Sequence, residues 1–259
     1  MSLGRLKLFL RQAKPSQSSS AGGFKGYLAF VDSVLGQRPE DAAMIEAVGG
    51  GEDVGDMEAT LLDRFGLAAN SHVIDVGCGS GRLARPLARL PQVRYLGTDI
   101  NQKLLDYAAK TCGRPDFRFT RVEGTQIPER DGVADLVVFF SVGTHLLQEE
   151  FFLYLEDARR VLKAGGRIIF SFLDVTLPGV RVVFRETVEV ARSGRRFHLN
   201  TFIGHSDIPA WAEMLAMKLV AVHPGDQSVG EASDAVREIL KETVAGRHLG
   251  QSVAVLEKV

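Results

Sequence analysis

The sequence predicts an α/β protein with a Rossmann-like, doubly wound sheet that is mostly parallel and carries helices on both faces. Three observations indicate this fold. From residue 72 onward, short β-branched runs alternate with helical patterns. The run ADLVVFFSV, residues 134–142, is almost continuously apolar, as expected for a strand buried on both faces. The first strand leads directly into three glycines within five positions, a pattern typical of a tight turn between a strand and a helix.

The expected elements follow one another in a regular order. Asn101 is expected to cap the start of the helix at residues 101–112, because asparagine is common at the position before the first turn of a helix. Residues 175–210 interrupt the alternation with an irregular, arginine-rich insertion. Strands are expected at residues 72–77, 93–100, 117–124, 134–142, 167–174, 218–224 and 252–259. Helices are expected at residues 53–67, 81–90, 101–112, 148–166, 208–217 and about 231–245.

The same pattern divides the chain into a flexible N-terminal arm (1–23), a helical extension (24–70) and a main α/β domain (71–259) that contains the insertion. The formal net charge of −1 gives no reason to expect nucleic acid or an anionic membrane as the main partner. No apolar stretch reaches the roughly 18–20 residues that cross a bilayer. Cys78 and Cys112 provide neither a disulfide framework nor a metal-binding spacing. We therefore expect a cytoplasmic protein; a homodimer is compatible with these features.

The glycines at the end of the first strand do not fit two common phosphate-binding loops. A P-loop needs Lys and then Ser or Thr after its last glycine, whereas Gly81 is followed by Arg82. A dinucleotide fingerprint needs a small residue at the position that Arg82 occupies. What remains is an acidic residue followed by G-x-G-x-G, namely Asp75 and then Gly77, Gly79 and Gly81.

Two carboxylates flank this loop in the predicted fold. Asp75 precedes the first glycine by two residues, which suits a ligand with a positive group and no phosphate. Asp99 ends the second strand, where a carboxylate can accept hydrogen bonds from two ribose hydroxyls. Together the two positions favour a cationic nucleoside ligand over a pyrophosphate.

On these residues, the chain resembles the class I S-adenosylmethionine-dependent methyltransferases. VIDVGCGSGRLA (73–84) is similar to the first motif of that family and YLGTDI (95–100) to its second. VEGTQIP (122–128) resembles the segment that reaches the adenine, and RVLKAGGRIIFSF (160–172) resembles the approach to the fifth strand. The resemblance covers about residues 55–175 and implies S-adenosylmethionine as cofactor. It also implies a seven-stranded sheet with an antiparallel last strand.

The resemblance implies a role for individual residues. The glycine loop would hold the methionine part of the cofactor, Asp99 and the backbone at Ile100 the ribose, and Glu123 and Gly124 the adenine. Many family members carry Asp where this chain has Glu123, which could instead be a solvated loop acid. Ser141 would line the pocket near the methyl group, or could simply end the fourth strand. The full set of implied cofactor-binding residues is Asp75, Gly77, Cys78, Gly79, Gly81, Asp99, Ile100, Glu123, Gly124 and Ser141.

Methyl transfer to a hydroxyl is helped by a general base, and His145 is the candidate catalytic residue. It follows the fourth strand, at the edge where open α/β sheets place active residues, and histidine titrates near neutral pH. The alternative is that His145 caps or packs against the next helix. His198 and His205 in the insertion are candidates for contact with the acceptor. No spacing of His, Asp and Glu argues for a catalytic metal.

We therefore expect a methyltransferase that acts on a small molecule, with a hydroxyl of a sugar or of a natural-product-like metabolite as acceptor. Base-methylating relatives carry Asp or Asn, Pro, Pro and an aromatic residue after the fourth strand, where this chain reads Phe-Phe-Ser-Val. The alternative function is a non-catalytic protein of the same fold that binds adenosyl ligands or a partner. A nicotinamide-dependent oxidoreductase is disfavoured by Arg82 in the loop.

Overall fold

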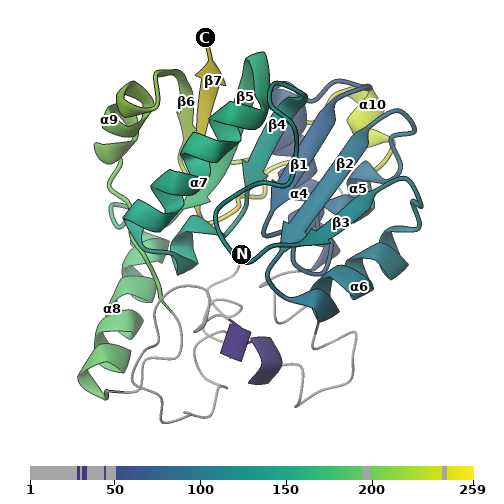
Figure 1. The fold of residues 1–259 in the computed structure, drawn as a ribbon. Helices are drawn as coiled ribbons and strands as arrows, with labels where there is room; N and C mark the ends of the chain where they lie inside the picture. Colours follow the sequence, from purple (N-terminus) through teal and green to yellow (C-terminus); the bar gives the residue numbers. More distant parts are fainter. Residues whose placement is uncertain (1–27, 30, 34–43, 45–50, 195–198, 241–243) are drawn as a thin grey trace.

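The strands form one seven-stranded sheet in the order β3-β2-β1-β4-β5-β7-β6 (Figure 1). A computed structural model of the chain describes residues 28–29, 31–33, 44, 51–194, 199–240 and 244–259. Strand β7 runs antiparallel to both of its neighbours, and the other pairs are parallel, which confirms the predicted sheet. The predicted N-terminal arm lies outside the described residues. The strands are β1 (His72–Val76), β2 (Arg94–Asp99), β3 (Arg118–Arg121), β4 (Ala134–Phe139), β5 (Leu162–Phe172), β6 (Met217–His223) and β7 (Ser252–Lys258).

Helices cover both faces of this sheet (Figure 1). They are α4 (Glu52–Arg64), α5 (Ala84–Leu87), α6 (Gln102–Cys112), α7 (Gln148–Val161), α8 (Pro178–Arg192), α9 (Asp207–Met214) and α10 (Asp234–Arg237), with a 3-10 turn η1 (Gly143–His145). On one face, Leu61 of α4 and Leu87 of α5 belong to one buried apolar cluster. On the other face, Phe151 of α7 and Ile208 of α9 belong to a second cluster. The sheet is therefore the middle of three layers.

An aromatic cluster joins α7 to the middle of the sheet. The ring of Phe151 lies 5.5 Å from that of Phe139 and 5.3 Å from that of Phe170, in edge-to-face geometry. Trp211 of α9 packs on the same ring at 6.1 Å. Such contacts add to the free energy gained by removing the apolar surface from water. This packing fixes α7 and α9 on β4 and β5.

Local signals account for the boundaries of several elements. Asn101 accepts a hydrogen bond from the backbone N–H of Lys103 at 3.0 Å, which confirms that Asn101 caps α6. The helix ends at Gly113, whose φ of 67° is favourable for glycine and costly for most other residues. Strand β1 is buried at every position, in agreement with a sheet covered on both faces.

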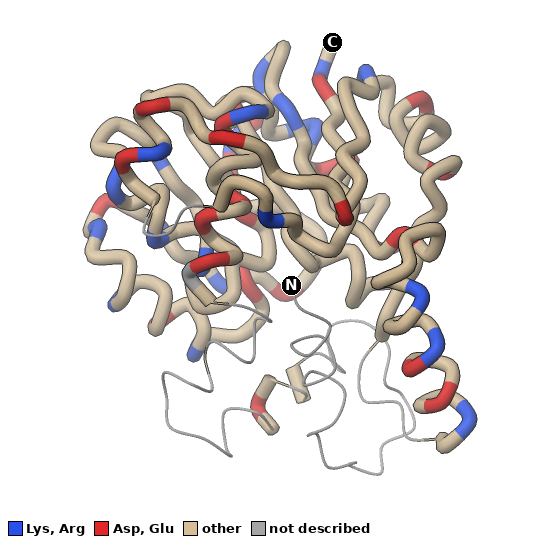
Figure 2. Tube along the Cα trace, turned by 180° about the vertical axis from the view of Figure 1, so that it is seen from behind, with Lys and Arg blue, Asp and Glu red and all other residues tan. Residues whose placement is uncertain are grey.

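The insertion at residues 175–210 was predicted to be irregular, and this prediction is wrong for residues 178–192, which form the helix α8. Pro178 lies at the start of this helix, where its missing N–H costs little. Val180 and Val183 are buried and share one face of the helix. Helix α8 extends beyond the end of the sheet (Figure 1), and it carries both basic and acidic residues (Figure 2).

Three further boundaries differ from the prediction. Gly165 and Gly166 were expected to close a helix, but they lie within β5, which begins at Leu162 and shifts register against β4 after Ala134. The helix expected at residues 81–90 is limited to α5, around Pro86. The helix expected at about 231–245 is limited to α10 within the described residues.

The aromatic cluster provides a test of this packing. We expect Phe170→Ala to lower the free energy of unfolding by about 3–5 kcal/mol, because it leaves a cavity beneath α7. Phe184→Ala is the matched control, since Phe184 is 42% exposed and should cost much less. Urea unfolding monitored by circular dichroism measures both values. Equal losses for the two variants would contradict the assignment of Phe170 to the core.

Candidate functional site

The glycine loop between β1 and α5 adopts a backbone that only glycine tolerates well. Gly77, Gly79 and Gly81 have φ values of 71°, 55° and 82°, in the left-handed region. A Cβ atom on Gly77 would lie 2.5 Å from Cγ2 of Val142, and one on Gly81 would lie 2.9 Å from Cβ of Ala108. The loop is thus pressed between the segment after β4 and helix α6.

The end of β2 holds this loop in place. The carbonyl oxygen of Thr98 accepts hydrogen bonds from the backbone N–H of Gly77 at 2.7 Å and of Cys78 at 2.9 Å. The thiol of Cys78 is buried, and burial raises its pKa well above the usual range. The thiol is therefore protonated at neutral pH and acts as a small apolar group.

Asp99 connects the loop to the beginning of α6. Its two carboxylate oxygens accept backbone N–H groups, one from Gly79 at 3.0 Å and one from Asn101 at 2.9 Å. Burial raises the pKa of Asp99 to about 6, against the opposing effect of these backbone donors, which include Ile100. Each carboxylate oxygen can accept a second hydrogen bond, so Asp99 retains the capacity to bind a pair of ligand hydroxyls.

Asp75 lies beneath the loop, on the face of the sheet that α4 covers. Its Oδ2 accepts a 2.6 Å hydrogen bond from the hydroxyl of Tyr95. The pKa of Asp75 is raised to about 7, mainly by burial; the nearby carboxylates of Glu58 and Asp99 contribute to the rise, whereas Tyr95 and Arg82 oppose it. A positive ligand group nearby would favour the ionised form of this carboxyl.

Helix α4 contributes two residues that the sequence analysis missed. Glu58 forms a buried ion pair with Arg82, with contacts of 2.6 Å to Nη2 and 3.1 Å to Nε. A Cβ atom on Gly55 would lie 2.2 Å from the carbonyl oxygen of Arg82, so the two backbones are in contact. Glycine and glutamate at this spacing, within an otherwise apolar helical face, are a signal that could have indicated the contact.

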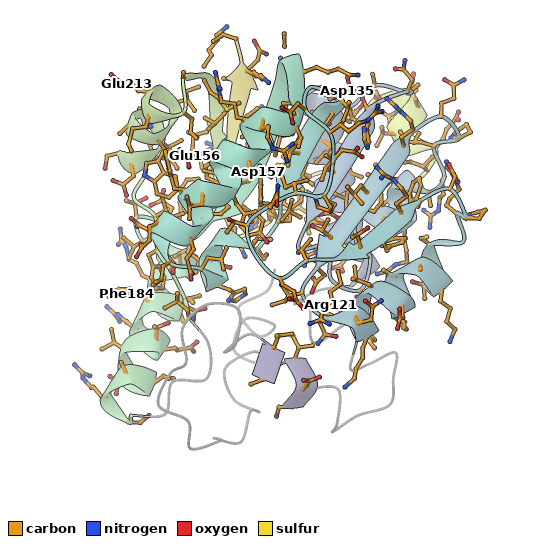
Figure 3. The ribbon with its side chains drawn as sticks, viewed as in Figure 1. Arg121, Asp135, Glu156, Asp157, Phe184 and Glu213 are labelled. Carbon is orange, nitrogen blue, oxygen red and sulfur yellow. The ribbon has the colours of Figure 1, made fainter. Side chains whose placement is uncertain are left out.

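The segment after β3 approaches Asp99 through its backbone. The N–H of Val122 donates to the carbonyl oxygen of Asp99 at 3.0 Å. The carbonyl of Gly124 accepts a 2.7 Å hydrogen bond from Tyr154 of α7. The side chain of Glu123 is 82% exposed and pairs with Arg121 at 3.1 Å, at the end of β3 (Figure 3). The structure therefore brings the backbone of this segment to Asp99, while the side chain of Glu123 lies in solvent.

Ser141 and His145 lie just beyond β4, at the same edge of the sheet. Ser141 has a φ of 64°, which is uncommon for a residue with a side chain and is a form of strain found often at functional sites. Nδ1 of His145 lies 3.0 Å from the carbonyl oxygen of Leu199. Because a carbonyl can only accept, Nδ1 carries the proton and Nε2 is the basic nitrogen of the neutral ring. Burial lowers the pKa of His145, which keeps the ring neutral at pH 7.

The sequence analysis also named two histidines of the insertion as candidates for contact with the acceptor. His198 lies outside the described residues. His205 is more than half exposed, and its Nδ1 lies 3.7 Å from Oδ2 of the buried Asp174, beyond hydrogen-bond distance.

Comparisons with known proteins indicate the family to which this fold is related. Residues 73–166 match the family model described as "Methyltransferase domain". A ubiquinone biosynthesis O-methyltransferase from Rhizobium rhizogenes is 32% identical over 124 residues, which are 46% of this chain and 48% of that protein. A ribosomal protein L11 methyltransferase from Clostridium botulinum is 33% identical over 39% of this chain and 31% of its own length. The chain thus spans about half or less of the length of these curated relatives.

A solved structure extends the similarity to most of the chain. The TehB-like SAM-dependent methyltransferase from Corynebacterium glutamicum superimposes with a TM-score of 0.50 and 25% identity, over 78% of this chain and 88% of that one. Residues 73–166 therefore form a methyltransferase domain, and the solved structure similar to most of the chain is that of an S-adenosylmethionine-dependent methyltransferase. Within the part of the chain that the structure describes, no helix is long and apolar enough to cross a membrane.

The buried carboxyls predict how the stability of the ligand-free protein depends on pH. Their folded pKa values, about 7 for Asp75 and about 6 for Asp99, exceed the unfolded value of 3.8. The folded state therefore binds more protons, and the free energy of unfolding should fall as pH rises from about 4 to 7. Asp75→Asn should make this decline shallower in urea unfolding at several pH values. An unchanged slope would contradict the raised pKa of Asp75.

The ion pair between Glu58 of α4 and Arg82 predicts that substitutions of these two residues have strongly coupled effects on the free energy of unfolding. We expect Arg82→Met to cost about 3–5 kcal/mol of stability at pH 8, because it leaves the buried carboxylate of Glu58 unpaired. The double variant Glu58→Leu, Arg82→Met should recover much of this loss, since neither charge remains. Additive effects in a double-mutant cycle measured by urea unfolding would show that the two side chains do not interact.

Proposed function

We propose that this protein transfers the methyl group of S-adenosylmethionine to a hydroxyl of a small organic acceptor. The observation that carries the proposal is a glycine loop bordered by two buried carboxyls, Asp75 and Asp99. A pyrophosphate would be repelled there, whereas an adenosyl ligand with positive groups would be attracted. The class of the domain supports the same conclusion.

The residues at the carboxyl edge of the sheet fit this cofactor. Asp99 would accept the two ribose hydroxyls through its remaining acceptor positions, next to the backbone of Ile100. The backbone at Glu123 and Gly124, held at Asp99 through Val122, would contact the adenine. The glycine loop would accommodate the methionine part at close range, because three of its five residues are glycines and the side chains of Cys78 and Ser80 are buried. Asp75 would favour the ammonium group at the end nearest Tyr95.

His145 would act as the general base. When bound, S-adenosylmethionine supplies an electrophilic methyl group: the acceptor oxygen bonds to the methyl carbon as the carbon–sulfur bond breaks, and that electron pair stays on sulfur. Nε2 of His145 would take the hydroxyl proton, since Nδ1 is committed to the carbonyl of Leu199. The rest of the catalysis is alignment and exclusion of water, to which the partial burial of His145 contributes.

The acceptor class rests on two observations. The relative from Rhizobium rhizogenes is named an O-methyltransferase of ubiquinone biosynthesis, which favours a small molecule with a hydroxyl. The relative from Clostridium botulinum is named for a protein acceptor, so the named acceptors of the two relatives differ. A hydroxyl of a sugar or natural product is therefore our proposal for this chain. A screen of sugars, phenols and amines with methyl-labelled S-adenosylmethionine tests it. Binding of the cofactor without transfer to any acceptor would favour the non-catalytic alternative.

Asp99 provides a direct test of the ribose assignment. We expect Asp99→Ala to weaken binding of S-adenosylmethionine about 100-fold, because two hydrogen bonds to a charged group are lost. Asp106→Ala, at an exposed position on α6, is the matched control and should bind normally. Isothermal titration calorimetry measures both affinities. Unchanged binding by the Asp99 variant would refute the assignment.

His145 provides the test of catalysis. We expect His145→Ala to lower kcat by about 100-fold or more, with the affinity for S-adenosylmethionine unchanged, because a general base acts only in the chemical step. His248→Ala, at an exposed histidine, is the control. Because burial lowers the pKa of His145, turnover of the unchanged enzyme should persist below pH 6.5 and decline only at lower pH. Full turnover by the His145 variant would return this residue to a structural role.

A further inference from the structure

Three residues from separate segments of the chain, Ser141 after β4, Ser171 in β5 and Gln251 before β7, form a closed ring of hydrogen bonds. The backbone N–H of Ser141 donates to Oγ of Ser171 in β5 at 2.7 Å. The hydroxyl of Ser171 donates to Oε1 of Gln251 at 2.8 Å, and Nε2 of Gln251 donates to Oγ of Ser141 at 3.1 Å. Gln251 lies directly before β7, outside the segment that matches the methyltransferase family model.

The direction of each hydrogen bond in this ring is fixed. A backbone N–H can only donate, so the hydroxyl of the fully buried Ser171 accepts it and must send its own proton to Gln251. This sets the orientation of the Gln251 amide and places its NH₂ group against Ser141. The oxygen of Ser141 therefore accepts, and its hydroxyl proton points away from Gln251. Such a chain also polarises the final hydroxyl, which makes it a better donor.

The ring also holds the turn that carries His145. The left-handed backbone of Ser141 is stabilised by its bond to Ser171, and the carbonyl of Ser141 accepts a 2.9 Å bond from Thr144. The chain at Gln251 is held in turn by Gly225, where a Cβ atom would lie 2.4 Å from the Gln251 carbonyl carbon. Ser141 and Gln251 are only half-buried, so this polar group is accessible from the edge of the sheet.

The electrostatics of the site indicate what the Ser141 hydroxyl would bind. An amino-acid ligand carries an ammonium and a carboxylate, and the buried carboxyls of Asp75 and Asp99 disfavour the carboxylate near them. An uncharged donor beyond the end of β4 suits that group. Ser141 adjoins Val142, whose side chain contacts Gly77, so the hydroxyl borders the methionine end of the glycine loop.

We propose that Ser171 and Gln251 are positioning residues that direct the hydroxyl of Ser141 toward the methionine carboxylate of the cofactor. This inference rests on the proposed function, because it presupposes an adenosyl cofactor in the loop. It adds two residues to the site, Ser171 of β5 and Gln251 just before β7. It also assigns to Ser141 the group of the ligand that its hydroxyl would contact.

Two related ligands test this assignment by calorimetry. S-adenosylhomocysteine carries the carboxylate, whereas 5′-methylthioadenosine lacks the whole amino-acid group. We expect Ser141→Ala and Ser171→Ala to weaken S-adenosylhomocysteine about tenfold and to change 5′-methylthioadenosine less than about twofold. Gln251→Glu should weaken S-adenosylhomocysteine at least as much, because a carboxylate only accepts and so turns the Ser141 proton inward. Gln92→Glu, at an exposed position on the opposite edge of the sheet, controls for the added charge.

The outcomes separate the inference from the function on which it rests. Unchanged affinity for S-adenosylhomocysteine in the Ser141 and Gln251 variants would overturn the inference while leaving the proposed function intact. Equal weakening of both ligands would also overturn it, because the ring would then only support the fold of the loop. If the unchanged protein binds neither ligand, the proposed function fails first and the inference falls with it. Thermal unfolding of each variant confirms that it is folded before binding is compared.

Discussion

The carboxylate of Asp99 is the interaction on which the site depends, since it joins the glycine loop, the end of β2 and the beginning of α6. Its oxygens hold the backbone of Gly79 on one side and of Asn101 on the other. The left-handed glycines give the loop its shape, and a Cβ atom on Gly77 or Gly81 would collide with the neighbouring chain. A carboxylate that organises the backbone can at the same time accept hydrogen bonds from ligand hydroxyls. Asp99 therefore holds the loop in place and would also bind the ribose.

Beneath the loop, the electrostatics favour a positive ligand. The carboxyls of Glu58, Asp75 and Asp99 are buried close together, and the guanidinium of Arg82 is the cation paired with Glu58. Burial raises the pKa of Asp75 to about 7 and that of Asp99 to about 6, so a cation bound beside them would favour loss of their protons. At the other end of the site, the uncharged donors around Ser141 would suit the negative end of the same ligand. The two ends together would suit a zwitterionic amino acid joined to a nucleoside.

Features encoded locally could be predicted from the sequence, whereas contacts between distant segments could not. The glycine loop, Asp75 and the Asn101 cap follow from short patterns, as do the strands of the sheet. The pairing of Ser141 with Gln251 joins positions 110 residues apart, and no short pattern specifies it. Helix α8 was missed because its many valines lower helix propensity, and only packing around residues such as Val180 and Val183 overrides that preference.

The most direct test of this account is calorimetry of the unchanged protein with S-adenosylmethionine at pH 6.5, in two buffers of different ionisation enthalpy. Binding should release protons, because a cation beside Asp75 lowers the pKa that burial has raised to about 7. NAD should not bind under the same conditions. Binding of NAD in place of S-adenosylmethionine, or cofactor binding with net uptake of protons, would contradict this account.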